Sequence, residues 1–378
     1  MSEQAYSTAA TAAATVSKFF ERLVAGTSEH PASAAPPPDP DAVAAIVDAA
    51  FWASLRREEG RTTRISLALA PPEHSGKPLR FEYSLPLTPD SLTRLAPAVE
   101  RRGIHLAVWR QDGELRVWGA TRVVPDLCFI LEVVEPGLLV MKYRRGAAFG
   151  KFGNIAVIRG NELRVVDEQH ASSPNYPAFL SAFLGKEAPD AWVASMNEFV
   201  QLAISIREHG HGGALIIVPT GSDKWRESIV GPVSYAVSPP FSTLGDLLEQ
   251  PEHDRVTAEW SDAVSKVIDG IGGLTAVDGA TIMNERHDLL AFGAKLGRRE
   301  GSAAVDRISV TEPILGSRPF IIAPSQFGGT RHLSAAQFVH DQRDAIAMVA
   351  SQDGRFTVFA WSPHDSIVQA NRIEALLL

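Results

Sequence analysis

The spacing of apolar residues predicts two helices near the start of the chain. Residues 11–24 and 41–57 each place apolar side chains at the spacing of an amphipathic helix. Residues 28–40 lie between them and contain five prolines, which is typical of a linker. We therefore expect an N-terminal helix and linker over residues 1–40, with the first helix docked on a remote part of the chain or on another subunit.

From residue 62 to residue 167 the apolar positions alternate, which is the spacing of half-buried strands. Turns separate the runs, and residues 111–113 and 159–161 are typical of hairpins. One helix is expected over residues 91–102. The pattern predicts a strand-rich α+β domain over residues 41–185, with strands at residues 62–69, 79–85, 104–110, 114–122, 128–135, 138–143, 155–159 and 163–167.

A second change of pattern, at residues 185–189, predicts a domain boundary. Helical and strand-like runs are mixed after it, which is typical of an α/β domain with helices flanking a mixed sheet. We assign this domain to residues 188–372. Helices are expected over residues 190–208, 241–248, 255–268 and 330–342, and strands over residues 214–219, 233–237, 275–283, 289–296, 318–322, 345–350 and 355–360.

Composition narrows the class of protein. The 378 residues carry a formal net charge of −8, which disfavours a general nucleic-acid-binding surface. The single cysteine, Cys128, excludes an internal disulfide framework. No apolar run is long enough to span a membrane, and no secretory signal is recognisable, so we expect a cytoplasmic protein that does not contact membranes.

The first candidate for chemistry is a glycine turn that leads into a helix, at residues 328–336. Gly328 and Gly329 would let a ligand approach the main chain, and the start of a helix presents unpaired N–H groups that suit phosphate. Arg331 would add a bidentate donor for phosphate oxygens. The alternative is a helix capped by Thr330, with an exposed arginine and histidine beside it.

A carboxylate marks the second candidate. Asp278 and Gly279 stand just before the apolar run at residues 281–283, so the carboxylate lies at the edge of a predicted strand, where it could hold Mg²⁺. The alternative is an ordinary Asp-Gly turn. His209 and His211 suggest a metal pair, but no third ligand is near in the sequence, and a loop with two exposed imidazoles is the simpler interpretation.

Taken together, four landmarks resemble the diadenylate cyclase domain, the catalytic module of the DNA-integrity scanning protein and of the membrane-bound cyclic di-AMP synthases. They are a glycine-then-apolar strand at residues 212–217, Asp-Gly-Ala at 278–280, Gly-Thr-Arg-His-x-x-Ala-Ala at 329–336, and the segment 344–351. The resemblance covers residues 190–370, and nothing in the first 185 residues carries it.

The resemblance implies a site and a reaction. Two such domains face each other in a homo-oligomer, each with one ATP, and each 3′-hydroxyl attacks the α-phosphorus of the other nucleotide. The implied cofactor is Mg²⁺ or Mn²⁺. The implied residues are Asp278, Gly279 and Arg331 for catalysis; Gly328, Gly329, Thr330, Arg331, His332 and Ser351 for ATP and its phosphates; and Asp278 and Asp353 for the metal.

Several positions depart from the family pattern. Val277 replaces a histidine, Leu333 replaces a second arginine, and Gln352 and Asp353 replace two glutamates. Lys295, Arg298 or Arg299 could supply the missing cation. Two functions therefore stay open. One is a diadenylate cyclase regulated by its N-terminal domain, and the other is a non-catalytic module that binds ATP or cyclic di-AMP at a degenerate site.

The N-terminal domain carries a group of basic residues: Lys142, Arg144, Arg145 and Lys151. They could form an anion site on a loop, or a solvated basic loop. A domain upstream of a cyclase-like module is often a sensor, so we expect this domain to bind a small molecule or a protein. That expectation rests on association alone.

Overall fold

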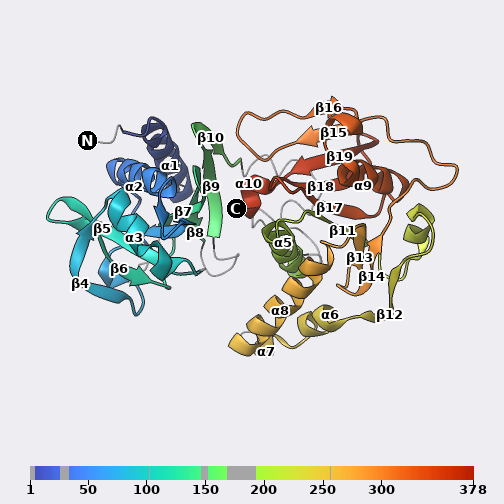
Figure 1. Ribbon diagram of the computed structural model, residues 1–378, viewed down its shortest axis with the longest axis horizontal. Coiled ribbons are helices and arrows are strands. Elements are labelled where there is room, and N and C mark those ends of the chain that lie inside the picture. Colours follow the sequence, from blue (N-terminus) through green and yellow to red (C-terminus); the bar gives the residue numbers. More distant parts are fainter. Residues whose placement is uncertain (1–4, 26–33, 102, 146–151, 168–192, 256) are drawn as a thin grey trace. The chain divides into compact units, whose positions relative to one another are not determined.

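The structure is a computed structural model that describes residues 5–25, 34–101, 103–145, 152–167, 193–255 and 257–378. The chain divides into two compact units, Met1–Val166 together with Leu378, and Asp167–Leu377 (Figure 1). The predicted boundary at residues 185–189 lies outside the described residues. No helix in the described part of the chain is long and apolar enough to cross a membrane.

The first unit is built on an eight-stranded sheet with the order β10-β9-β8-β7-β3-β5-β6-β4. β3 and β5 pair in parallel, and the other neighbours pair antiparallel. A separate ribbon joins β1 (Arg57–Glu58) to β2 (Arg61–Thr62). The sheet strands are β3 (Ile65–Leu69), β4 (Leu79–Pro86), β5 (His105–Gln111), β6 (Glu114–Thr121), β7 (Phe129–Glu135), β8 (Leu138–Arg144), β9 (Phe152–Arg159) and β10 (Glu162–Val165).

Three helices share one apolar core with this sheet: α1 (Thr8–Ala25), α2 (Pro40–Ser54) and α3 (Pro89–Val99). The rings of Tyr6 and Phe51 stack with their centroids 3.7 Å apart, which ties the start of α1 to α2. The expectation that the first helix docks on a remote part of the chain is confirmed: α1 packs within its own unit against segments that are remote in the sequence, and Phe19 contacts the ring of Tyr143 on β8. A single 3₁₀ turn, η1 (Pro72–His74), lies between β3 and β4.

The second unit is built on a nine-stranded mixed sheet with the order β12-β14-β13-β11-β17-β18-β19-β15-β16. The strands are β11 (Gly213–Val218), β12 (Tyr235–Phe241), β13 (Ala280–Asn284), β14 (Leu289–Ala294), β15 (Ile308–Thr311), β16 (Phe320–Ile322), β17 (Ile346–Ala350), β18 (Phe356–Ser362) and β19 (Ile367–Arg372). The helices are α5 (Val193–Glu208), α6 (Thr243–Leu248), α7 (Glu252–Arg255), α8 (Ala258–Leu274), α9 (Thr330–Asp341) and α10 (Glu374–Leu377), with short 3₁₀ turns η3 (Lys224–Ser228) and η4 (Pro324–Gln326).

Helices cover both faces of this second sheet (Figure 1). Ile216 of β11 belongs to the core that α9 covers, and its neighbours Leu215 and Ile217 belong to the core under α5 and α8. A strand that is buried on both faces has apolar residues at every position. The continuous apolar run at residues 214–218 therefore predicted β11 correctly. The predicted fold class is confirmed: a strand-rich α+β unit precedes an α/β unit with a mixed sheet.

The sequence analysis did not predict two strands of the second unit, β15 and β19. They pair with each other in parallel, and Thr311 donates a hydrogen bond of 2.6 Å to the buried Asn371. Buried polar residues such as Gln369 and Asn371 interrupt the apolar alternation that marks a strand. The strand predicted over residues 275–283 begins later, at Ala280, because the residues before it form turns.

Candidate functional site

One edge of the second sheet carries a pocket of about 500 Å³. β11 and β13 run parallel, so Ala214 and Ala280, near their starts, reach the same edge. β14 and β17 run antiparallel to them, so their last residues, Ala294 and Ala350, end there too. The N-terminus of α9 opens on this pocket as well. The topology therefore gathers segments that lie far apart in the sequence.

The predicted glycine turn does lead into α9, but its glycines act differently from each other. Gly329 is the N-cap, and no described side chain caps the helix, so the expected cap by Thr330 is wrong. Gly329 has φ −74°, which any residue can adopt, and a Cβ added there would meet no described atom within 4 Å. A Cβ on Gly328 would lie 2.8 Å from the His332 ring. Gly328 makes room for that ring, whereas Gly329 leaves the helix N-terminus open.

Arg331 lines the pocket from the first turn of α9 and lies against the loop before β11. Gly212, in that loop, has φ +70°, and a Cβ added to it would lie 3.2 Å from Nη1 of Arg331. The ring of His209 binds Thr275 through Nε2, at 3.0 Å. Burial lowers the pKa of His209, and the charges of His211 and Arg331 lower it further. This loop therefore packs against Arg331. Among the described residues, no group of three or more histidine, cysteine, aspartate or glutamate side chains could hold a metal ion.

His332 also lines the pocket, but its side chain is buried. Its ring lies edge-on to Phe327 and Phe359, with centroid distances of 5.6 and 6.1 Å. Burial lowers the pKa of His332; the carboxylate of Asp353 opposes that effect, and nearby arginines add to it. A neutral imidazole can hydrogen-bond a phosphate oxygen, but it brings no charge to the pocket.

Asp278 and Gly279 also line the pocket. Gly279 has φ +119°, and a Cβ added there would lie 2.5 Å from the carbonyl carbon of Gly293, so only glycine fits this approach. The Asp278 carboxylate forms an ion pair with Nζ of Lys295. The hydrogen bond and the charge of Lys295 lower the pKa of Asp278, and the charge of Arg331 contributes. The carboxylate is therefore ionised and exposed at the pocket mouth.

The hairpin between β17 and β18 supplies Ser351 and Gln352 to the pocket lining. Gln352 donates to the carbonyl oxygen of His211 at 3.4 Å. Asp353 is not among the described lining residues; its carboxylate lies 3.3 Å from Nε of Arg355 within its own turn. Burial would raise the pKa of Asp353, but hydrogen bonds from Arg355 and Ser351 outweigh it and lower that pKa. A metal-binding role for Asp353 stays a prediction.

The donor set supplies a divalent cation with few protein ligands. Asp278 is the one carboxylate among the described residues that line the pocket. Mg²⁺ commonly binds proteins through one or two carboxylates and completes its coordination with substrate phosphates and water. The residues therefore fit a metal that Asp278 would hold with water and, when a nucleotide is bound, with its phosphates, and they do not form a closed protein site.

Leu296 and Ser334 line the pocket although the sequence analysis did not select them, and of the three basic residues that could supply the missing cation only Lys295 is in the described lining. The hairpin of β13 and β14 could have located Lys295, because pairing Ala280 with Ala294 puts residue 295 beside Asp278. Leu333, in place of the family's second arginine, is 41% exposed. With Lys295 and Arg331 against Asp278, the described lining carries an excess of positive charge and favours an anionic ligand.

Two of the four basic residues that the sequence analysis noted in the first unit form ion pairs. Lys142 forms an ion pair with Glu132, and Arg144 forms one with Asp126 at 3.2 Å. Both basic residues lie on β8, so they belong to the sheet and not to a loop. Lys151 lies outside the described residues. The interpretation of these residues as a solvated basic loop is wrong for Lys142 and Arg144, because each is held by a carboxylate.

Comparisons with known proteins match parts of the chain. Residues 32–122 match a family model described as "Probable sensor domain DACNV". No curated protein matches the chain. Among solved structures, the chain is similar to DacA from Staphylococcus aureus, crystallised as a double mutant, with 13% identity over 46% of this chain and 83% of that one. The TM-score of that match is 0.25, so we base no argument on it.

The family match and the cyclase-like motifs lie in different parts of the chain. It covers part of the first unit, and the residues that resemble a diadenylate cyclase domain all lie in the second. The order of the two is the one expected for a cyclase-like domain that follows a sensor. The DACNV match and the cyclase motifs together relate this chain to the diadenylate cyclases that carry an N-terminal sensor domain.

Proposed function

We propose that the second unit binds ATP in the pocket between Asp278 and the N-terminus of α9, and condenses two ATP into cyclic di-AMP with release of two pyrophosphates. The observation that carries this proposal is the meeting of two motifs, Asp278-Gly279 and residues 329–332, across one pocket, although about 50 residues separate them. The DACNV match upstream supports the same family.

The residues have distinct roles in this proposal. The open N–H groups at Gly329 and Thr330 and the guanidinium of Arg331 hold the phosphates, because a helix N-terminus and a fixed cation both stabilise negative charge. Gly279 lets the nucleotide pass close to the backbone. Asp278 orients the attacking 3′-hydroxyl and accepts a hydrogen bond from it. Charge develops on the departing pyrophosphate, so preformed donors at that place lower the barrier.

Mg²⁺ or Mn²⁺ bound to Asp278 and the phosphates would neutralise the charge on the transferred and leaving groups. Each pocket holds one ATP, so the reaction needs two pockets face to face. A homo-oligomer of the second unit is therefore part of the proposal. The first unit would regulate this assembly in response to a small molecule or a protein.

A second function is favoured by specific residues. Leu333 replaces an arginine of the family, and Asp278 is already paired with Lys295. A pocket with fewer phosphate donors and an occupied carboxylate suits a module that binds ATP or cyclic di-AMP without turning it over. This alternative uses the same pocket and the same Arg331.

The deciding experiment is incubation of the full chain with ATP and Mg²⁺ or Mn²⁺, with the products separated by mass. A cyclase yields cyclic di-AMP, and its specific activity rises with protein concentration until the pockets are paired. ATP binding with either metal, together with no cyclic product at any protein concentration, would reject the cyclase and leave the binding module.

A further inference from the structure

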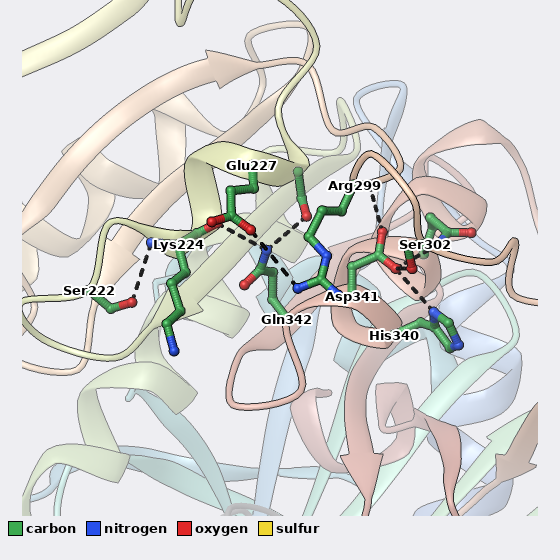
Figure 2. Close-up of polar contacts among 10 residues, drawn as sticks. Ser222, Lys224, Glu227, Arg299, Ser302, His340, Asp341 and Gln342 are labelled. Carbon is green, nitrogen blue, oxygen red and sulfur yellow. Dashed lines mark hydrogen bonds and ion pairs between the residues drawn. The ribbon is translucent and has the colours of Figure 1, made fainter.

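A lysine at the mouth of the pocket has no counterpart in the motifs discussed so far. Lys295 follows β14 directly and lines the pocket. The nearby Arg299 turns away: its Nη1 lies 3.9 Å from a carboxylate oxygen of Glu227, and its backbone N–H binds Asp341 (Figure 2). Of these two basic residues, Lys295 is the one that a ligand in the pocket can reach.

The backbone fixes Lys295 beside Asp278. Ala280 pairs with Ala294 across β13 and β14, so the residues just before the one and just after the other are neighbours. The main chain at Gly279 also lies close to the main chain at Gly293, because a Cβ added to Gly279 would lie 2.5 Å from the carbonyl carbon of Gly293. The register of the sheet therefore places the backbone of Lys295 opposite Gly279, next to Asp278 in the chain.

The ion pair between Lys295 and Asp278 is open to solvent, with the side chains 52% and 89% exposed. Exposed ion pairs are weak, because water and salt compete for both partners. Asp278 is also the one carboxylate in the described lining of the pocket. A divalent cation that binds this carboxylate consequently competes with the ammonium group for it.

We propose that Lys295 is an exchangeable counter-ion of Asp278. In the absence of a divalent cation, the ammonium neutralises the carboxylate. When a cation binds Asp278, the ammonium is released and binds a phosphate of the nucleotide beside Arg331. Lys295 thus couples metal binding to phosphate binding and takes over part of the role of the arginine that Leu333 replaces. This inference rests on the nucleotide site proposed above.

The metal half of the inference is tested by titrating the full chain with Mn²⁺ in the absence of nucleotide and following free Mn²⁺ by electron paramagnetic resonance. Lys295→Met should bind Mn²⁺ about two- to fivefold more tightly, as expected when a weak competing ion pair is removed. Lys295→Arg keeps the charge and should resemble the wild type. Lys224→Met is the matched control, since it changes the net charge equally at a residue outside the described pocket lining.

The same titration in an Asp278→Asn background isolates the pair. The effect of Lys295→Met should vanish there. Three results would overturn the inference: unchanged Mn²⁺ affinity in Lys295→Met, equal tightening in Lys224→Met, or no Mn²⁺ binding to either the wild type or Lys295→Met. Because no ATP is present, a failure to form cyclic di-AMP does not affect this result, so the inference and the proposed function can fail separately.

The phosphate half is tested by calorimetry of ATP binding, once with Mn²⁺ and once with EDTA. If Lys295 is released by the metal, Lys295→Met should weaken ATP binding by a larger factor with Mn²⁺ than with EDTA. Equal factors in the two conditions would show that the lysine does not exchange. An ATP affinity in the wild type too weak to measure would overturn both this half and the proposed function, and the Mn²⁺ titration would still decide the other half.

Discussion

The two ends of α9 are both polar, but only one of them is closed. At the C-terminal end the side chain of Asp341 is fully buried. It accepts hydrogen bonds from the backbone N–H of Arg299 at 2.9 Å, from the Gln337 amide at 3.0 Å, and from the Ser302 hydroxyl (Figure 2). This cluster satisfies its own groups and holds the segment after β14 against the helix.

At the N-terminal end the polar groups face the pocket. Gly329 brings no side chain to the helix start, and Thr330 and Arg331 line the open space. The difference between the two ends of α9 indicates which polar clusters stabilise this fold and which bind a ligand. A cluster that pairs its donors and acceptors internally stabilises the protein. One that leaves donors directed at a cavity serves a ligand, so changes at the two ends should separate stability from binding.

The largest effect is expected for Asp278→Asn, opposite the open end of the helix. Asn keeps the shape but loses the charge that holds a metal and orients the nucleophile, so cyclic di-AMP formation should fall by about 100-fold or more. Thermal stability should stay unchanged because the carboxylate is exposed. Product analysis by mass and a melting curve test both points. The control is Asp223→Asn, which changes an exposed carboxylate outside the described pocket lining. Wild-type turnover in Asp278→Asn would show that Asp278 takes no part in the reaction.

Arg331→Ala should act on binding itself. A charge-assisted contact to phosphate contributes enough that its loss should weaken ATP binding about tenfold or more. Arg343, just beyond the other end of α9, stacks on Trp361 at 4.1 Å. Arg343→Ala should leave ATP affinity unchanged, and calorimetry with both variants measures the contrast. Equal losses would mean that the phosphates do not bind at the N-terminal end of α9.

Much of the fold could be predicted from the sequence because the burial pattern is simple. In β3, Ile65, Leu67 and Leu69 belong to the core that the helices of the first unit share, and the polar Ser66 does not, so the apolar alternation survives in the sequence. In β19, Gln369 and Asn371 are buried although they are polar, so that strand left no such signal. Alternation reveals a strand only where one face is apolar and the other is not.

The site could be predicted in part. Asp278, Gly279 and residues 329–332 carried recognisable motifs, and the structure brings them to one pocket. The placement of Lys295 depends on the register of Ala280 against Ala294, which the local sequence does not encode. The separate roles of Gly328 and Gly329 depend on the His332 ring, whose direction follows from packing. Motifs therefore indicated which residues meet, and tertiary contacts decided which of them reach the ligand.

Asp341→Asn should reduce the free energy of unfolding by about 1–2 kcal/mol, because buried hydrogen bonds to a charged group are lost or rearranged. Burial would raise the pKa of Asp341, but the bonds from Ser302, Arg299 and Gln337 outweigh it and lower that pKa. The stability that Asp341 contributes is therefore complete above the unfolded-state pKa of about 3.9, and it is lost as the pH falls through the lower native pKa. Denaturant unfolding between pH 2 and 7, with the exposed Asp344→Asn as control, measures the difference, which should narrow at the acid end. A constant difference across this range would contradict the assignment.

The smallest expected effect tests whether the open end of α9 is open for a ligand. In Gly329→Ser the hydroxyl at the N-cap can accept from the N–H groups of the first turn, which should stabilise the helix by a few tenths of a kcal/mol. The same hydroxyl would occupy the donors that a phosphate needs, so ATP binding should weaken by about two- to fivefold. Gly328→Ala is the comparison, because its Cβ would press on the His332 ring and should lower stability instead. The melting temperature should therefore rise in Gly329→Ser and fall in Gly328→Ala, and calorimetry should show weaker ATP binding in Gly329→Ser although that variant is the more stable. If Gly329→Ser binds ATP as the wild type does, the N–H groups of α9 do not hold the phosphates, and Arg331 would have to hold them without help from the helix.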